Sequence, residues 1–88
     1  RMTSAHQFSV ADDGGPGPVR LNLSGRVTVE SAAQFRGAAL ALVAGGRPVR
    51  VCCGAVEHFD AAGLQVLVAL GRELLGRGLR CDVEDVPP

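Results

Sequence analysis

Hydrophobic and polar residues alternate along four short stretches of the chain, and this period of two predicts β-strands. The stretches are HQFSVAD at 6–12, VRLNL at 19–23, RPVRVCC at 47–53 and LRCDVE at 79–84. The residues expected to face the core from them are Phe8, Val10, Val19, Leu21, Leu23, Val49, Val51, Cys53, Leu79, Cys81 and Val83. Every second residue of the second and fourth strands is polar, so one face of the sheet is expected to contact water.

Between the second and third strands the apolar spacing lengthens to that of a helix. One stripe of the segment SAAQFRGAALALVAGG holds Phe35, Ala39, Leu42 and Val43. Ser31 is the expected N-cap of this helix, and Gly45 with Gly46 is the expected stop.

A second helical segment follows the third strand, within EHFDAAGLQVLVALGRELLGRG at 57–78. Asp60 is its expected N-cap, and the helix is expected to end near Leu75. At 100° per residue, the face expected to cover the sheet holds Leu64, Leu67, Val68, Gly71, Leu74 and Leu75. The residues expected to point away are Gln65, Val66, Ala69 and Glu73, with Leu70 on the border. The outward apolar residues are either ordinary exposed side chains or part of a protein-binding patch.

The predicted order of elements is β-β-α-β-α-β, an α/β fold with a mixed four-stranded sheet. Two β-α-β units imply parallel pairing with right-handed crossovers, while the first two strands can form a hairpin across the turn-rich ADDGGPGP segment. If both crossovers step in the same direction along the sheet, both helices lie on one face.

The composition limits the chain to one domain with an aliphatic core. Its 88 residues suffice for a modest core, and 47% of them are hydrophobic. Nine basic and nine acidic residues are scattered along the chain, so no basic stripe indicates nucleic-acid binding. No apolar run approaches the roughly 18 residues that cross a bilayer, and a signal-peptide core is absent, so a cytoplasmic protein is expected.

Three cysteines and a nearby histidine raise the question of metal or thiol chemistry. Cys52 and Cys53 are adjacent and would point to opposite faces of a strand, so they are not expected to form a disulfide. An odd cysteine count without framework spacing favours reduced thiols that pack as small hydrophobic side chains. His58 follows them, but the spacing of metal-binding motifs is absent and strand-buried thiols are usually inert. We therefore expect no metal, no cofactor and no enzymatic activity.

The stretch FDAAGLQVLVAL, between a strand and GLRCDVEDV, resembles the signature of the STAS domain, the fold of bacterial anti-sigma factor antagonists. In that family an Asp, a Ser or Thr, a small residue and a Gly open the second main helix. The segment VRLNLSGRVTVESAAQF is similar to the family's second strand, its L-x-G end and its first helix. The resemblance covers about residues 8 to 86 and implies a mixed four-stranded sheet with helices.

The resemblance implies a role in partner switching and transcription regulation. In the family, an unphosphorylated antagonist captures a kinase-type anti-sigma factor, and phosphorylation of the Ser or Thr after the Asp ends the capture because the added charge repels the interface. The motif positions here are Asp60, Ala61, Ala62 and Gly63. Because Ala61 stands at the phosphoacceptor position without a hydroxyl, this chain is not expected to be switched there.

Three consequences of this alanine stay open. The domain binds its partner constitutively, it is controlled at another hydroxyl, or it belongs to a docking branch such as the stand-alone STAS domains of chemosensory systems. The nearby hydroxyls are those of Ser24, Thr28 and Ser31.

A protein-binding surface is expected at the loop and the helix entrance. Its expected residues are Ser24, Gly25, Asp60, Ala61, Ala62, Gly63, Leu64, Gln65, Val66 and Leu70. The expected partner is a kinase-type anti-sigma factor or a chemosensory kinase; the alternative is the ATPase of an ABC lipid-transport system. Neither nucleic acid nor direct membrane insertion is expected, and a weak homodimer is left open. Gly63 is unfavourable in a first helical turn, which indicates close approach by a partner or a neighbouring loop.

The two ends of the chain carry further expectations. Residues 1–6 are expected to be a tail or an expression remnant, because Arg1 precedes Met2, the expected native start. Family members usually continue past the last strand into a further helix, whereas this chain stops at VEDVPP. Residues 1–88 are thus expected to form a single STAS domain. Either the sequence is truncated before that helix or the helix is absent, and in both cases part of the core face is expected to be uncovered.

Overall fold

The secondary-structure elements follow the order that the alternating pattern predicts. The computed structural model describes residues 8–12 and 17–86. The elements are β1 (Phe8–Ala11), β2 (Val19–Val27), α1 (Val29–Gly45), β3 (Val49–Phe59), α2 (Ala61–Gly76) and β4 (Cys81–Glu84). Parts of the predicted first strand and of the ADDGGPGP turn lie outside the described residues.

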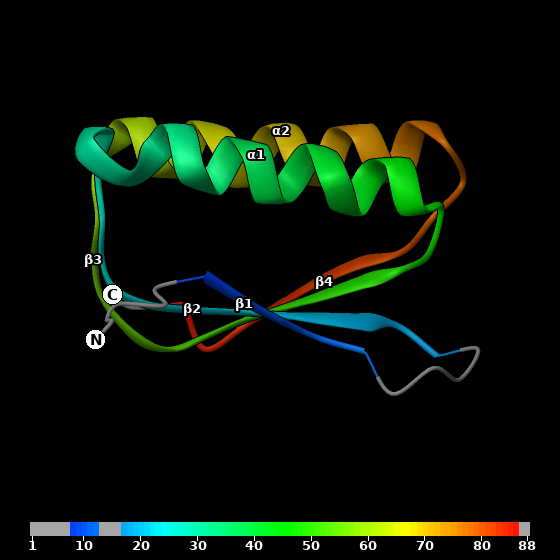
Figure 1. Ribbon diagram of the computed structural model, residues 1–88, viewed down its shortest axis with the longest axis horizontal. Helices are drawn as coiled ribbons and strands as arrows, with labels where there is room; N and C mark the ends of the chain where they lie inside the picture. Colours follow the sequence, from blue (N-terminus) through cyan, green and yellow to red (C-terminus); the bar gives the residue numbers. More distant parts are fainter. Residues whose placement is uncertain (1–7, 13–16, 87–88) are drawn as a thin grey trace.

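The strands form one mixed sheet in the order β1-β2-β3-β4. Strand β1 pairs antiparallel with β2, whereas β2, β3 and β4 run parallel. Both crossovers therefore step in the same direction, and right-handed connections then place α1 and α2 on the same face of the sheet. Figure 1 shows the two helices side by side above the sheet, which confirms the predicted architecture.

The core lies between the sheet and the two helices and is largely aliphatic. Its buried residues are Leu21, Leu23, Val27, Phe35, Ala39, Val43, Val49, Val51, Cys53, Val56, Leu70 and Leu74. The ring of Phe8 stacks on that of Phe35, with 5.4 Å between their centroids. The opposite face of the sheet is polar as predicted: Arg50 on β3 pairs with Glu84 on β4, with 3.7 Å between Nε and Oε2.

The ends of the sheet differ from the prediction in two ways. Strands β2 and β3 run on to Val27 and Phe59, beyond the alternating stretches, with shifts of register near Ser24 and Gly25. Val10 on β1 and Val83 on β4 were expected in the core but are exposed. Both lie on edge strands, whereas the strand residues buried in the core all belong to the two central strands, β2 and β3.

The N-cap of α1 was predicted three residues too late. Thr28, and not Ser31, is the N-cap, and Ser31 lies in the first turn, where it is buried. The Ser31 hydroxyl accepts a hydrogen bond of 3.1 Å from the backbone amide of Thr28. The serine therefore stabilises the first turn by bonding to the N-cap residue. The predicted end is confirmed: Gly46 follows the helix with φ of 70°, a conformation that glycine adopts without strain.

The predicted buried face of α2 was wrong by about a quarter of a turn. Gly63, Leu70 and Leu74 are the buried residues of this helix, whereas Leu64, Val68 and Leu75 are exposed. The physical reason is Gly63, whose missing side chain lets the first turn lie directly against the backbone of Val27. A Cβ at position 63 would overlap the Val27 carbonyl oxygen. This contact fixes the rotation of the helix and brings Leu70 and Leu74 over the sheet.

Candidate partner-binding surface

The carboxylate of Asp60 holds the first turns of both helices. Asp60 is the single residue between β3 and α2 and is the N-cap of α2, as predicted. Its Oδ1 accepts a hydrogen bond of 2.9 Å from the Gly63 amide, and its Oδ2 accepts one of 2.8 Å from the Val29 amide at the start of α1. The Asp60 amide in turn donates to the Val27 carbonyl at 3.1 Å. The end of the sheet and two helix N-termini therefore meet at one residue.

This environment favours the charged form of Asp60. The pKa of its carboxyl lies below the ordinary value, first because the Gly63 amide donates to it and also because the Val29 amide does so. Burial acts in the opposite direction, and the His58 side chain adds a smaller lowering of the pKa. A negative charge also suits the positive ends of two helix dipoles. These bonds hold the junction between β3 and α2.

The residues after Asp60 are not equally accessible. Ala61 is exposed at the first helical position, Ala62 is half-buried and Gly63 is buried. The close approach predicted at Gly63 is made by Val27 of the neighbouring β2, and not by a partner. Only the first of the three motif positions after the aspartate is fully open to another protein.

Exposed apolar side chains surround this entrance. Leu64 is 43% exposed and Val68 is 55% exposed, and together with Gln65, Ala69 and Arg72 they line a shallow groove of about 330 Å³. Val29, whose amide bonds to Asp60, is 70% exposed. Sequence reasoning missed Val29 and assigned Val68 to the core. We call the set Val29, Asp60, Ala61, Leu64, Gln65 and Val68 the entrance surface.

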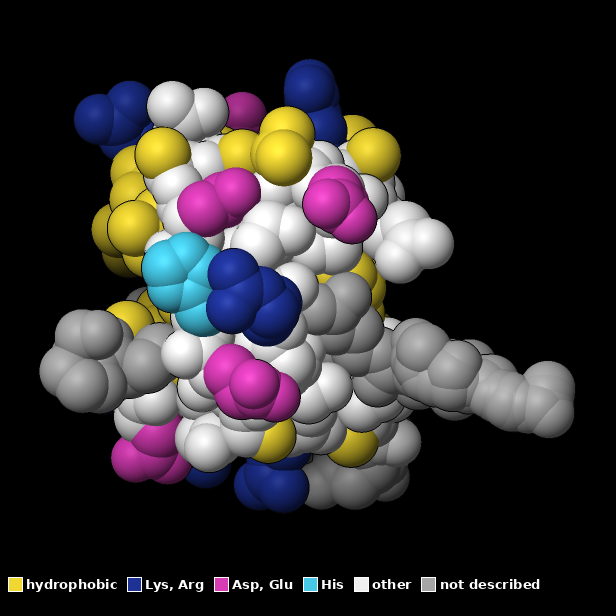
Figure 2. Space-filling model, turned by 90° about the vertical axis from the view of Figure 1, so that its left-hand side faces the viewer, with side chains coloured by type: hydrophobic (Ala, Val, Ile, Leu, Met, Phe, Trp, Pro, Cys, Tyr) yellow, Lys and Arg dark blue, Asp and Glu magenta, His cyan; other side chains and the backbone are white. Residues whose placement is uncertain are grey.

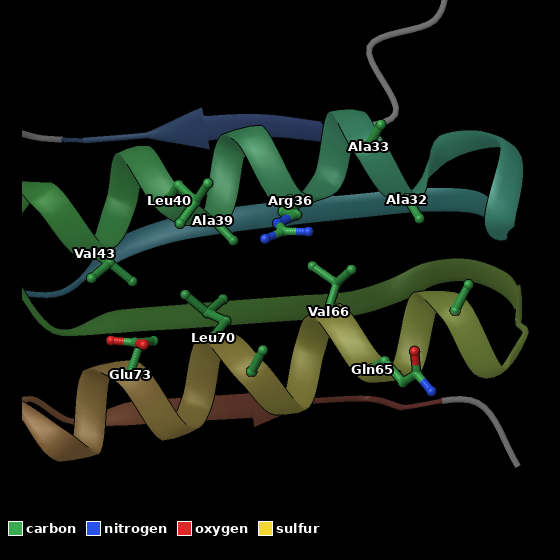
Figure 3. A pocket seen from close by; sticks show the side chains of 12 residues that line it. Ala32, Ala33, Arg36, Ala39, Leu40, Val43, Gln65, Val66, Leu70 and Glu73 are labelled. Atoms are coloured by element: carbon green, nitrogen blue, oxygen red, sulfur yellow. The ribbon is translucent and has the colours of Figure 1, made fainter.

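Two residues predicted for this surface lie elsewhere. Leu70 is only 2% exposed and belongs to the core, so the prediction that it extends a surface patch was wrong. Val66 is half-buried and packs against the core. Both residues line a second groove, which runs between α1 and α2 and has a volume of about 580 Å³ (Figure 3).

Polar residues gather at the end of the molecule where both helices begin. Ser24 and Gly25 lie there in β2, beside Ala55 and Val56 of β3, and both are half-buried. Figure 2 shows this end, where a histidine and side chains of both charge signs lie below apolar side chains. Of the three candidate hydroxyls, that of Ser31 belongs to a buried residue, whereas Ser24 and Thr28 are half-buried.

Comparison with known families decides where the chain belongs. The family model described as "Mlab, STAS domain" matches residues 10–88. The chain is a STAS domain. A search of curated proteins returns no match.

Solved structures share the fold of this STAS domain. It is 28% identical to Mglu over 89% of its own length but only 19% of the Mglu chain, with a TM-score of 0.75. It is 17% identical to the Bacillus anti-sigma factor antagonist SpoIIAA, covering 91% of itself and 74% of that chain, with a TM-score of 0.74. An anti-sigma factor antagonist from Mycobacterium paratuberculosis is 24% identical, with coverage of 93% and 70% and a TM-score of 0.73.

The thiols of this STAS domain lie in environments that suit packing. Cys53 is buried in the core, and burial raises its pKa; the neighbouring Cys52 and Asp85 act in the same direction. Burial also raises the pKa of Cys81. Among residues 8–12 and 17–86, no group of three His, Cys, Asp or Glu side chains could hold a metal ion. Within the same residues, no helix is long and apolar enough to span a bilayer.

Proposed function

We propose that this STAS domain is a non-catalytic module that binds another protein through the entrance surface. The observation that carries the proposal is the exposure of Ala61, Leu64 and Val68 around a helix start that Asp60 holds rigid. Apolar side chains on a fixed backbone lose little conformational entropy on binding, which favours recognition by a partner. The structural likeness to proteins described as anti-sigma factor antagonists supports this role.

The proposed partner is a kinase-type anti-sigma factor or a chemosensory kinase. Ala61 takes the exposed position directly after the capping aspartate, where family members carry a hydroxyl. A methyl group there can be neither phosphorylated nor repelled as a phosphate would be, so binding is not switched at this residue. Regulation, where it occurs, acts through the supply of partner or through another residue such as Thr28.

A second candidate is docking on the ATPase of an ABC lipid-transport system. The family description names Mlab and not an antagonist, and this supports a role outside sigma-factor control. The same entrance surface would bind the ATPase, since this docking requires only exposed apolar side chains at a rigid helix start.

Affinity capture from the native host with two variants tests the proposal. The baits are the wild type, Leu64→Glu and the matched control Leu75→Glu, which changes an exposed leucine about 16 Å further along the same helix. We expect the wild type and the control to retain one partner, identified by mass spectrometry, and Leu64→Glu to lose it.

The identity of the captured protein separates the candidates. An ATP-binding anti-sigma factor or a chemosensory kinase supports the first candidate, whereas an ABC ATPase with its permease supports the second. Retention of the same partner by Leu64→Glu would place the binding surface elsewhere.

A further inference from the structure

The groove between α1 and α2 is a second apolar surface, which adjoins the entrance surface at Gln65. Its lining includes five alanines together with the apolar side chains of Val66 and Leu70. The alanines are Ala32, Ala33, Ala39, Ala62 and Ala69. Leu40 stands on the α1 wall of the groove and is 58% exposed. One face therefore carries both a protruding leucine and a hollow lined by alanines.

Two opposite charges flank this apolar strip. Arg36 lies on the α1 side and Glu73 on the α2 side, and both line the groove. Figure 3 shows them displaced along the groove, with Leu40 and Leu70 between them. Among residues 8–12 and 17–86, neither side chain takes part in an ion pair. A cation and an anion on either side of an apolar centre leave the face complementary to itself.

We propose that this helical face binds a second copy of the chain in a twofold symmetric dimer. A twofold interface is self-complementary, so a residue i that contacts j brings j onto i as well. An axis that passes between Arg36 and Glu73 places Arg36 of each copy beside Glu73 of the other. Leu40 then lies near the axis and packs against the helical face of the second copy.

The size of the face agrees with an interface of moderate strength. The molecule extends 30 Å along the helices and 22 Å in depth, and the helices form the layer that covers this area (Figure 1). A face of these dimensions approaches the roughly 800 Å² per partner of a standard interface. The central contacts are apolar, and the two ion pairs fix the orientation, as charges at interfaces commonly do.

Sedimentation velocity on the full chain at increasing concentration tests the dimer. The wild type is expected to shift from monomer to dimer. Arg36→Glu and Glu73→Arg are each expected to weaken dimerisation about tenfold or more, because each places like charges opposite one another. The double variant Arg36→Glu with Glu73→Arg restores opposite charges and is expected to recover most of the wild-type affinity. The matched control Arg77→Glu, an exposed arginine at the end of α2, is expected to leave it unchanged.

Circular dichroism of each variant is the check that it is folded. Leu40→Asp is a second disrupting variant, which leaves both Arg36 and Glu73 unchanged. A wild type that stays monomeric at every concentration would overturn the proposal. A dimer that is insensitive to the charge changes and to Leu40→Asp would also overturn it, because another face would then form the contact. A double variant that stays as weak as the single variants would exclude the Arg36–Glu73 pairing.

Discussion

The Oδ2 atom of Asp60 accepts a hydrogen bond of 2.8 Å from the backbone amide of Val29, which lies 31 residues earlier in the chain. The other oxygen of the same carboxylate caps α2 through Gly63. An ordinary N-cap satisfies donors of its own helix, whereas this one also satisfies a donor of the neighbouring helix. Asp60 therefore couples the starts of α1 and α2, on either side of the entrance surface.

Replacing Asp60 should lower stability by an amount that depends on how many of its two hydrogen bonds are lost. Asparagine keeps an oxygen for Gly63 but turns an amide group toward the Val29 amide, so one bond is lost. Alanine loses both. We expect Asp60→Asn to lower the midpoint of thermal unfolding by a few degrees and Asp60→Ala by more, about 5 °C or above. Thermal unfolding followed by circular dichroism measures this.

Asp82→Asn is the control, because it removes only an exposed ion pair with Arg80, and such pairs contribute little. Equal midpoints for Asp60→Asn and the wild type would show that the bond to Val29 adds nothing to stability.

The lowered pKa of Asp60 predicts acid sensitivity. Because the folded pKa lies below the ordinary value of 3.8, the native state favours the carboxylate more than the unfolded chain does. The resulting stabilisation is complete above the unfolded pKa and is lost as the pH falls through the folded pKa. Urea unfolding at a series of pH values from about 5 down to about 2 should show this loss in the wild type. The pH dependence should be shallower in Asp60→Asn, and identical slopes would contradict the assignment.

Two glycines of α2 should respond to alanine in opposite ways. At Gly63 the new Cβ would overlap the Val27 carbonyl oxygen, so Gly63→Ala should destabilise the fold by about 2–3 kcal/mol. At Gly71 a Cβ meets nothing within 4 Å, and alanine favours the helix, so Gly71→Ala should stabilise it by up to about 1 kcal/mol. Urea unfolding of both variants measures the difference. A Gly63→Ala variant as stable as the wild type would contradict the close packing of α2 on β2.

The architecture could be predicted because it depends on local and repeating signals. The alternation in VRLNL and RPVRVCC, the 3.6-residue spacing around Phe35 and the stop at Gly46 are each present in a few neighbouring residues. The handedness rule then places both helices on one face. None of these inferences requires knowledge of which distant residues touch.

The details of the site depend on such distant contacts. The start of α1 includes a bond to Asp60, which the neighbourhood of Val29 does not reveal. The rotation of α2 depends on Gly63 meeting Val27, a residue of another element. A helix with leucines and valines on most sides offers several apolar stripes, and local spacing cannot choose between them. Asp60 was predicted as a cap because its signal is local, whereas Val29 was not predicted as a surface residue.

The rotation of α2 itself can be tested with two leucines that the alternative stripes place oppositely. In the structure Leu70 is buried beside the sheet and Leu64 is exposed at the entrance surface, whereas the sequence pattern favoured Leu64 as the core residue. We expect Leu70→Ala to lower the free energy of unfolding by about 3 kcal/mol, through lost burial and the cavity left behind. Leu64→Ala should change it by less than about 0.5 kcal/mol, as exposed positions usually do. Chemical unfolding of both variants gives the two values. Because Leu64 is proposed to contact the partner, Leu64→Ala should weaken binding while leaving the fold intact. A larger loss of stability for Leu64→Ala than for Leu70→Ala would show that Leu64 belongs to the core and not to the entrance surface.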